Sequence, residues 1–404
     1  VLARTQTKEE YGMFALSYSV FTFLAGFHNA AILEPYTVYG SGRYRDRFSE
    51  YLRFMVRSNA LIGLLLTGLL LLTCLLSLWV APQFVSRALL GLGLTVGVLL
   101  SGAFLRRAFY LQRQAAYAAK TSLVFFVSVV CGLWLVWEAH LLDSLSVFLV
   151  LAVGWIVAGV CFGKELWFGR PEQTFLELVP HYWREHWKYT QWVLATALVF
   201  QFMTQGYYWL VAGFLSVKEV AELKAMYILL APVHQVFIAI SLLVLPALAS
   251  RYSAERMGSF LSLWKWYGLT ALGLTGLFAL LVRVLGIRAM HFLYTGKFDG
   301  VAPLLFVLAL SPVVMGVGNT MNDALKAVER PKFVFYAYLC SGVATFLGGI
   351  PLVMRFGLRG AVYGMLLSAA VYTGALAVGF FLTICARPIA VPEAKTGSCV
   401  TGAE

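Results

Sequence analysis

The polar side chains with the clearest spacing in this sequence lie in an otherwise apolar stretch, residues 189–214. Gln201, Thr204, Gln205 and Tyr208 follow at i, i+3, i+4 and i+7, which places them on one face of a helix. Amide and hydroxyl groups in such an apolar helix need hydrogen-bond partners or water. The spacing therefore has two interpretations: the wall of a cavity that binds a hydroxyl-rich ligand, or polar contacts between packed helices.

Basic and amide side chains at the ends of predicted helices form a second set of candidates. An arginine guanidinium binds phosphate oxygens through paired hydrogen bonds, so an arginine cluster can attract an anionic ligand. The residues with this potential are Arg57, Arg106, Arg107, Asn319, Asn322 and Lys326. Basic residues also gather at helix ends because they fix the orientation of membrane helices. Arg106 and Arg107 are about 100° apart on a helix, so at most one points directly into a cavity.

Titratable groups inside the apolar stretches are few, and three of them could bind or relay a cation. His234 follows Pro232 in the middle of an apolar stretch, where a proline bends a helix and frees a carbonyl group. Glu34 and Asp323 lie near the ends of their stretches, and we expect Glu34 to pair with a neighbouring arginine. Coupling to protons or sodium through these residues stays open.

Motifs for catalysis and for metal binding are missing from the sequence. It has no glycine-rich phosphate loop, no nucleophile elbow and no pair of carboxylates spaced for catalysis. Its cysteines are scattered at positions 74, 131, 161, 340, 385 and 399, without the spacing of a metal site or a disulfide framework. We therefore expect a protein that is not an enzyme, with no metal, no cofactor and no nucleic-acid partner.

The elements that carry these residues are predicted to be membrane helices. Hydrophobic residues make up 60% of the 404 residues, charged residues 12%, and the mean hydropathy is +0.79, which one soluble core cannot accommodate. The apolar stretches are continuous and about 20 residues or longer, which indicates helices rather than barrel strands. Eleven spans are predicted, at residues 11–39, 54–80, 88–112, 117–138, 143–163, 189–214, 226–250, 263–286, 300–325, 333–354 and 358–384.

Basic residues predict the orientation of these spans. About two thirds of the 31 lysines and arginines lie beside the ends that follow the odd-numbered spans, and such residues stay on the cytoplasmic side of a membrane. Val1 is then outside and Glu404 inside. The net charge of +12 favours an anionic substrate and an anionic membrane surface.

The spans form an internal repeat of five plus six. The matching segments are 7–10 with 216–219, 66–69 with 274–277, and 102–113 with 318–329. The span at 189–214 has no partner, and its counterpart is expected before Val1. We therefore predict an all-α polytopic membrane protein with two six-helix lobes, related by a pseudo-two-fold axis along the membrane normal.

Four regions are expected along the chain. They are an N-terminal lobe at 1–163 that lacks its first helix, a cytoplasmic linker at 164–188, a C-terminal lobe at 189–386 and a disordered tail at 387–404. The linker mixes aromatic and charged residues, which predicts an amphipathic segment on the membrane surface. It serves either as a passive connection or as a docking site for glycan-assembly enzymes.

Several segments give the chain a resemblance to a known family. They are Leu2-Ala3-Arg4, Glu10-Tyr11-Gly12, Ala31 to Tyr36, Arg106 to Tyr110 and Glu329 to Lys332. Over nearly its whole length the chain resembles the O-antigen type of lipid-linked oligosaccharide flippase, within the multidrug, oligosaccharidyl-lipid and polysaccharide exporter (MOP) superfamily. The resemblance implies that an undecaprenyl-pyrophosphate-linked oligosaccharide moves from the inner to the outer leaflet of a bacterial inner membrane by alternating access. It also implies a role in polysaccharide and lipopolysaccharide biosynthesis, and a monomer is favoured.

Two other classes of membrane protein fit the same composition. A multidrug or cation-coupled exporter of the same superfamily is expected to need a deep carboxylate for its cation, and the sequence places none at mid-depth. A membrane glycan polymerase or ligase needs a catalytic surface outside the membrane, and the predicted outer loops are short. The flippase is the preferred interpretation, and the exporter is the alternative.

Overall fold

The computed structural model describes residues 2–41, 44–79, 83–112, 114–163, 175–254, 256–328 and 330–385, and within these ranges it contains helices and no strands. The helices are α1 (Leu2–Thr5), α2 (Lys8–His28), α3 (Glu34–Ser41), α4 (Phe48–Ser77), α5 (Gln83–Leu111), α6 (Ala115–Glu138), α7 (Ser144–Phe162), α9 (Phe175–Phe214), α10 (Val217–Ser253), α11 (Met257–Tyr294), α12 (Leu304–Ala327), α13 (Pro331–Leu347) and α14 (Gly349–Phe380). A π-helical turn, Asn29–Leu33, joins α2 to α3.

The predicted spans match this helix order, which confirms an all-α polytopic fold. In the described part of the chain, nine helices are long and apolar enough to cross a membrane, and α13 is apolar but shorter. The predicted break between the last two spans, after residue 354, agrees with the structure. The chain reverses at Gly357, where φ is +59°, inside the segment labelled α14. A Cβ atom at Gly360 would overlap the Leu352 carbonyl oxygen, and Ser341 donates to the Ser368 carbonyl oxygen, so residues 331–356 and 358–380 run antiparallel.

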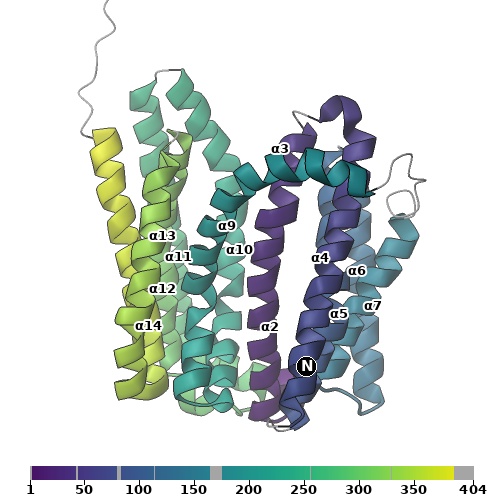
Figure 1. Ribbon diagram of the computed structural model, residues 1–404. Helices are drawn as coiled ribbons and strands as arrows, with labels where there is room; N and C mark the ends of the chain where they lie inside the picture. Colours follow the sequence, from purple (N-terminus) through teal and green to yellow (C-terminus); the bar gives the residue numbers. More distant parts are fainter. Residues whose placement is uncertain are drawn as a thin grey trace, which may run out of the picture.

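The helices form two bundles that meet along α2, α9 and α10. Helices α4 to α7 pack together beside α2, and α11 to α14 pack together beside α9 and α10 (Figure 1). We call these bundles the N lobe and the C lobe. The end of the molecule that carries the turns after α3, α5 and α10 is called the arginine-rich end, and the opposite end, where the described chain begins, is called the N-terminal end.

The buried apolar side chains make one shared core at the N-terminal end. This core joins Leu2, Tyr11 and Ala15 of the N lobe to residues of α9, α10, α12 and α14. At the arginine-rich end the buried residues instead form two clusters, one around Tyr36 and Phe104 and the other around α12 and α14. Continuous burial of apolar area therefore holds the lobes together at the N-terminal end.

Polar contacts fasten the same end. Lys8 Nζ of α2 lies 2.6 Å from Glu222 Oε1 of α10, and Lys218 Nζ of α10 lies 2.9 Å from Glu9 Oε1 of α2. In each pair a lysine of one helix contacts a glutamate of the other, so the two pairs are reciprocal. Both lie near the starts of helices that the sequence repeat relates. A Cβ atom at Gly12 would overlap the carbonyl oxygen of Val217. Glycine at this position lets α2 and α10 approach closely.

The first turns of α9 lie across the arginine-rich end before the helix runs down between the lobes (Figure 1). Tyr182 is fully buried there, and its hydroxyl donates to Glu50 Oε1 at 2.8 Å. Burial and this hydrogen bond raise the pKa of Tyr182 to about 12, so the hydroxyl keeps its proton near neutral pH. Trp183 and Trp187 are exposed. Residues 164–174 of the predicted linker and the predicted tail at 387–404 lie outside the described residues.

Candidate functional site

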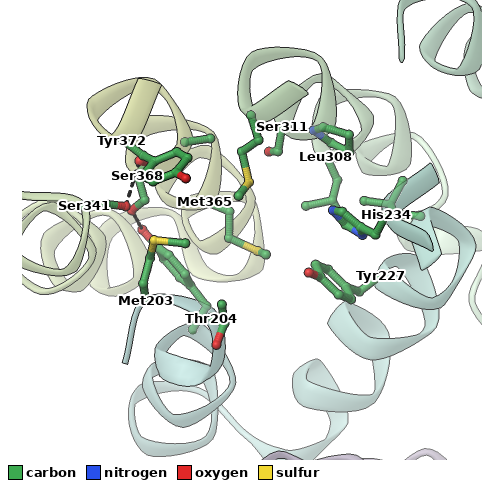
Figure 2. A pocket seen from close by; sticks show the side chains of 15 residues that line it. Met203, Thr204, Tyr227, His234, Leu308, Ser311, Ser341, Met365, Ser368 and Tyr372 are labelled. Carbon is green, nitrogen blue, oxygen red and sulfur yellow. Dashed lines mark hydrogen bonds between the residues drawn. The ribbon is translucent and has the colours of Figure 1, made fainter. Parts of the chain in front are cut away.

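A small pocket, with a cavity volume of about 60 Å3, lies inside the C lobe and is bounded by α9, α10, α12, α13 and α14. Figure 2 shows hydroxyl side chains of α13 and α14 on one side of it and Tyr227 and His234 of α10 on the other. Methionines from α9, α12 and α14 line the space as well. With a neutral histidine, the described residues that line the pocket carry no formal charge.

The hydroxyl side of the pocket is a connected hydrogen-bond network. Ser368 Oγ lies 3.0 Å from Tyr207 Oη and 3.0 Å from Thr345 Oγ1. Ser341 Oγ donates to the Ser368 carbonyl oxygen at 2.9 Å. A Cβ atom at Gly364 would lie 2.6 Å from Tyr207 Oη, so glycine there makes room for the phenol. Hydroxyl groups both donate and accept hydrogen bonds, and such a surface suits an uncharged polar ligand.

The opposite side of the pocket is aromatic and contains an unpartnered hydroxyl. The rings of Tyr227 and His234 stack with their centroids 5.5 Å apart. Ser311 of α12 is buried, and its Oγ has no hydrogen-bond partner among the described residues. A buried unpaired hydroxyl costs free energy, about 1–3 kcal/mol. A ligand or water that accepts from Ser311 would recover that cost.

A second polar group continues from the pocket toward the arginine-rich end. Tyr372, which also lines the pocket, accepts from Asn322 Nδ2 at 3.0 Å and donates to Asn319 Oδ1 at 3.4 Å. Asp323 is buried, and its Oδ2 accepts from Tyr267 Oη at 3.0 Å. The structure thus places three residues that were predicted from sequence, Asn319, Asn322 and Asp323, in one polar column along α12. Lys326, one turn further on, is exposed.

The predicted arginines of the N lobe occupy different environments. Arg107 is half-buried, and its Nη2 donates to Asn29 Oδ1 at 3.2 Å. Arg106 is exposed and Arg57 is half-buried. Asn29 begins the π-helical turn between α2 and α3, so an irregular turn of the helix presents this amide to the arginine.

The four polar residues predicted on one face of α9 do not share one wall. Gln201 Nε2 donates to the Thr22 carbonyl oxygen of α2 at 3.0 Å, which makes it a contact between helices. Thr204 lines the pocket, Gln205 is half-buried, and Tyr208 is buried in the shared core. Gln201 therefore fits the interpretation as a contact between helices, and Thr204 fits the interpretation as part of a cavity wall. The two differ because α9 lies between the lobes and its faces meet different neighbours.

The three candidates for cation coupling are far from equivalent. His234 lines the pocket and stacks on Tyr227, and Asp323 is held by Tyr267. Glu34 is half-buried at the start of α3 and has further contacts of its own. The sequence pattern missed Tyr207, Ser341 and Ser368, because serines are common in membrane helices and the three residues lie on three different helices.

Neither a family model nor a curated protein matches the sequence. The fold, however, is shared with solved structures. A multidrug resistance MATE family transporter of the MOP superfamily, in an inward-facing conformation, has a TM-score of 0.79 at 10% identity, over 94% of this chain and 91% of that one. The lipid II flippase MurJ, in an inward closed conformation, has a TM-score of 0.74 at 16% identity, over 95% and 85% of the two chains. This chain has the two-lobe fold of the MOP superfamily transporters.

A third MOP superfamily transporter, from Pyrococcus furiosus, has a TM-score of 0.65 at 12% identity, over 93% of this chain and 86% of that one. The two structures with the higher of these scores are both described as inward conformations. In this chain the shared core joins the lobes at the N-terminal end, and Tyr182 of α9 also contacts the N lobe at the arginine-rich end.

Proposed function

We propose that this chain moves an anionic, lipid-linked oligosaccharide from the cytoplasmic to the outer leaflet of a bacterial inner membrane by alternating access. The observation that carries the proposal is a pairing of two environments in one two-lobe fold. The N lobe offers arginines at one end, and the C lobe offers an uncharged pocket lined by hydroxyl groups, aromatic rings and methionines. A diphosphate and a sugar need these two environments.

The charges of the described residues favour an anion over a cation as the transported group. A lipophilic cation needs a free carboxylate in the path. Two buried or half-buried carboxylates already have partners, since Glu222 pairs with Lys8 and Asp323 accepts from Tyr267. The pocket itself has no acidic residue among its described lining.

Arg107 is the arginine best prepared to bind a phosphate. Among the described residues its hydrogen-bond acceptor is a neutral amide, Asn29 Oδ1, and most of its five N–H donors are left for a ligand. The N-terminal end is closed by the shared core, which favours loading from the arginine-rich end. Basic residues predict this end to be cytoplasmic, together with the C-terminus.

The proposal is tested by leaflet exchange in vesicles that contain the purified chain. The probe is a fluorescent sugar linked to a short polyprenyl diphosphate, and a membrane-impermeant quencher reports the outer leaflet. We expect Arg107→Ala to slow exchange about tenfold, the equivalent of one charge-assisted hydrogen bond. Arg106→Ala should have a smaller effect, and the double variant at least the effect of Arg107→Ala.

The matched control is Arg288→Ala, which removes an exposed arginine near the opposite end of the molecule. Equal exchange by Arg107→Ala and wild type, at equal protein levels, would show that the arginine serves orientation only. Imposing a proton or a sodium gradient in the same vesicles identifies the coupling ion, because only the coupled ion changes the exchange rate.

The multidrug exporter is the second candidate, and the burial of Asp323 favours it. A carboxylate at the base of a polar column could release Tyr267 and pair with a cation. Accumulation of a cationic dye in the same vesicles tests this alternative. Dye transport that Asp323→Asn abolishes, without exchange of the lipid-linked sugar, would replace the flippase by the exporter.

A further inference from the structure

Lys224 is a half-buried lysine of α10 whose ammonium group contacts two aromatic rings. Its Nζ lies 5.0 Å from the ring centroid of Tyr18 on α2 and 5.3 Å from that of Tyr208 on α9. The three residues come from the three helices along which the lobes meet. Among the described residues, no carboxylate lies within ion-pair distance of Lys224. Cation–π contacts stabilise such an ammonium but leave its N–H donors unused.

Two buried phenol groups of the shared core also lack hydrogen-bond partners among the described residues, and the ring of one of them, Tyr208, contacts the lysine. Tyr208 and Tyr11 are each 3% exposed, and neither hydroxyl has a hydrogen-bond partner among the described residues. Both belong to the shared core, Tyr11 on α2 and Tyr208 on α9. An ammonium and two buried hydroxyls without acceptors make a site that is rich in donors, which is the composition that an anion requires.

The acidic residues at this end are engaged elsewhere. Glu222, two residues before Lys224 on α10, is paired with Lys8, and Glu9 is paired with Lys218. The lysine therefore has no carboxylate counter-ion among the described residues. A charge held in this way is costly to bury unless a negative group visits the site.

The position of the cluster connects it to the pocket of the C lobe. Tyr227 lines that pocket, and its ring meets the ring of Tyr208 with the centroids 6.3 Å apart. One tyrosine thus separates the donor cluster from the uncharged hydroxyl-lined space. A ligand with an anionic group and an attached uncharged polar group could place the anion in the donor cluster and the polar group in the pocket.

We propose that Lys224, Tyr11 and Tyr208 form a binding subsite for a phosphate or diphosphate group in the half of the path nearer the N-terminal end. Its assignment to the lipid-linked substrate rests on the proposed function. In that assignment the anion leaves the arginines of the N lobe and is next held by this subsite, while the attached polar group occupies the pocket. The aromatic rings of Tyr18 and Tyr208 keep the ammonium in place between visits.

The test measures binding to the purified full-length chain in nanodiscs, with farnesyl diphosphate, farnesol and inorganic pyrophosphate as probes. Wild type should bind farnesyl diphosphate more tightly than farnesol. Lys224→Met should raise the Kd for farnesyl diphosphate at least tenfold, and Lys224→Arg should change it less than threefold. Tyr11→Phe and Tyr208→Phe, which each remove one hydroxyl, should each raise it severalfold.

Lys120→Met is the matched control, because Lys120 makes the same kind of cation–π contact, with Tyr117, at an exposed position. A Lys224→Met variant that binds farnesyl diphosphate like wild type overturns the subsite, even if its melting temperature falls, since Lys224 is then a structural brace. Pyrophosphate binding as tight as that of farnesyl diphosphate, and equally dependent on Lys224, overturns the assignment to a lipid.

Failure of the subsite and failure of the proposed function give different results. If wild type exchanges the lipid-linked sugar and Lys224→Met binds farnesyl diphosphate like wild type, the subsite is rejected and the proposed flippase function stands. Binding that depends on Lys224, without any leaflet exchange by wild type, supports an anion site in a protein that is not a flippase of this substrate.

Discussion

Replacing Gly12 by alanine is expected to open the N-terminal end of the molecule. The new Cβ atom would lie 2.8 Å from Val217 Cγ1 and would overlap the Val217 carbonyl oxygen, whereas ordinary contacts begin at 3.4 Å. The carbonyl belongs to the backbone of α10 and cannot rotate away like a side chain. Helices α2 and α10 must therefore separate, and the reciprocal ion pairs across them lengthen.

The magnitude follows from the cost of overpacking a fitted contact, about 1–3 kcal/mol. In a competing state with the N-terminal end open, Gly12 and Val217 are apart and the overlap does not arise. Gly12→Ala then shifts the equilibrium toward this open state roughly 5- to 150-fold. The reporter is Ala221→Cys, in a background with the native cysteines removed. Ala221 is fully buried in the shared core, so a membrane-impermeant maleimide reaches it only when this end opens.

We expect the labelling rate at position 221 to rise by that factor in Gly12→Ala. Gly68→Ala is the control, because a Cβ atom at Gly68 has no neighbour within 4 Å. Melting temperatures of both variants separate opening from general destabilisation. An unchanged labelling rate in a folded Gly12→Ala variant would refute the role of this contact in closing the N-terminal end.

Two further predictions concern single polar contacts. Reversing one charge, in Lys8→Glu or Glu222→Lys, should increase labelling at position 221 severalfold, because a pair at 2.6 Å becomes a like-charge contact. The combined reversal should restore the wild-type rate. A combined variant that labels faster than either single variant would contradict this prediction. Tyr182→Phe removes the hydrogen bond to Glu50 at 2.8 Å and should cost about 1–3 kcal/mol. Thermal unfolding of the purified chain measures that loss, and an unchanged melting temperature would show that Tyr182 does not fasten α9 to the N lobe.

The sequence predicted the helices well because a bilayer imposes a length and an apolar composition on every span. The break between the last two predicted spans was placed correctly, because Arg355, Gly357 and Arg359 interrupt the apolar run there. Gly357 has a positive φ, which glycine adopts at little cost. Many other membrane-helix glycines serve packing instead, and composition alone does not distinguish the two uses.

The site was predicted only in part, because spacing gives the face of a helix but not its neighbour. Asn319, Asn322 and Asp323 do lie together, as adjacent positions on one helix must. Gln201 and Thr204 instead meet different elements, α2 and the pocket. Long-range groupings, such as Ser341 with Ser368, depend on how α13 and α14 pack.

Lys224 illustrates the same limit for charge. Counting basic residues assigns it to the outer ends of the spans, because it precedes the predicted span at 226–250. In the structure α10 begins at Val217, and the lysine lies between the rings of Tyr18 and Tyr208. Its neighbours come from two other helices, and this grouping appears only when the lobes are assembled.

The central claim is that the chain moves a lipid-linked anionic sugar across a bilayer. The most direct measurement is the rate at which vesicles containing the purified wild-type chain bring a polyprenyl-diphosphate-linked sugar to the quencher-accessible leaflet. We predict acceleration over protein-free vesicles that Arg107→Ala reduces about tenfold, with no acceleration for a cationic dye. Equal rates with and without the protein would contradict the claim.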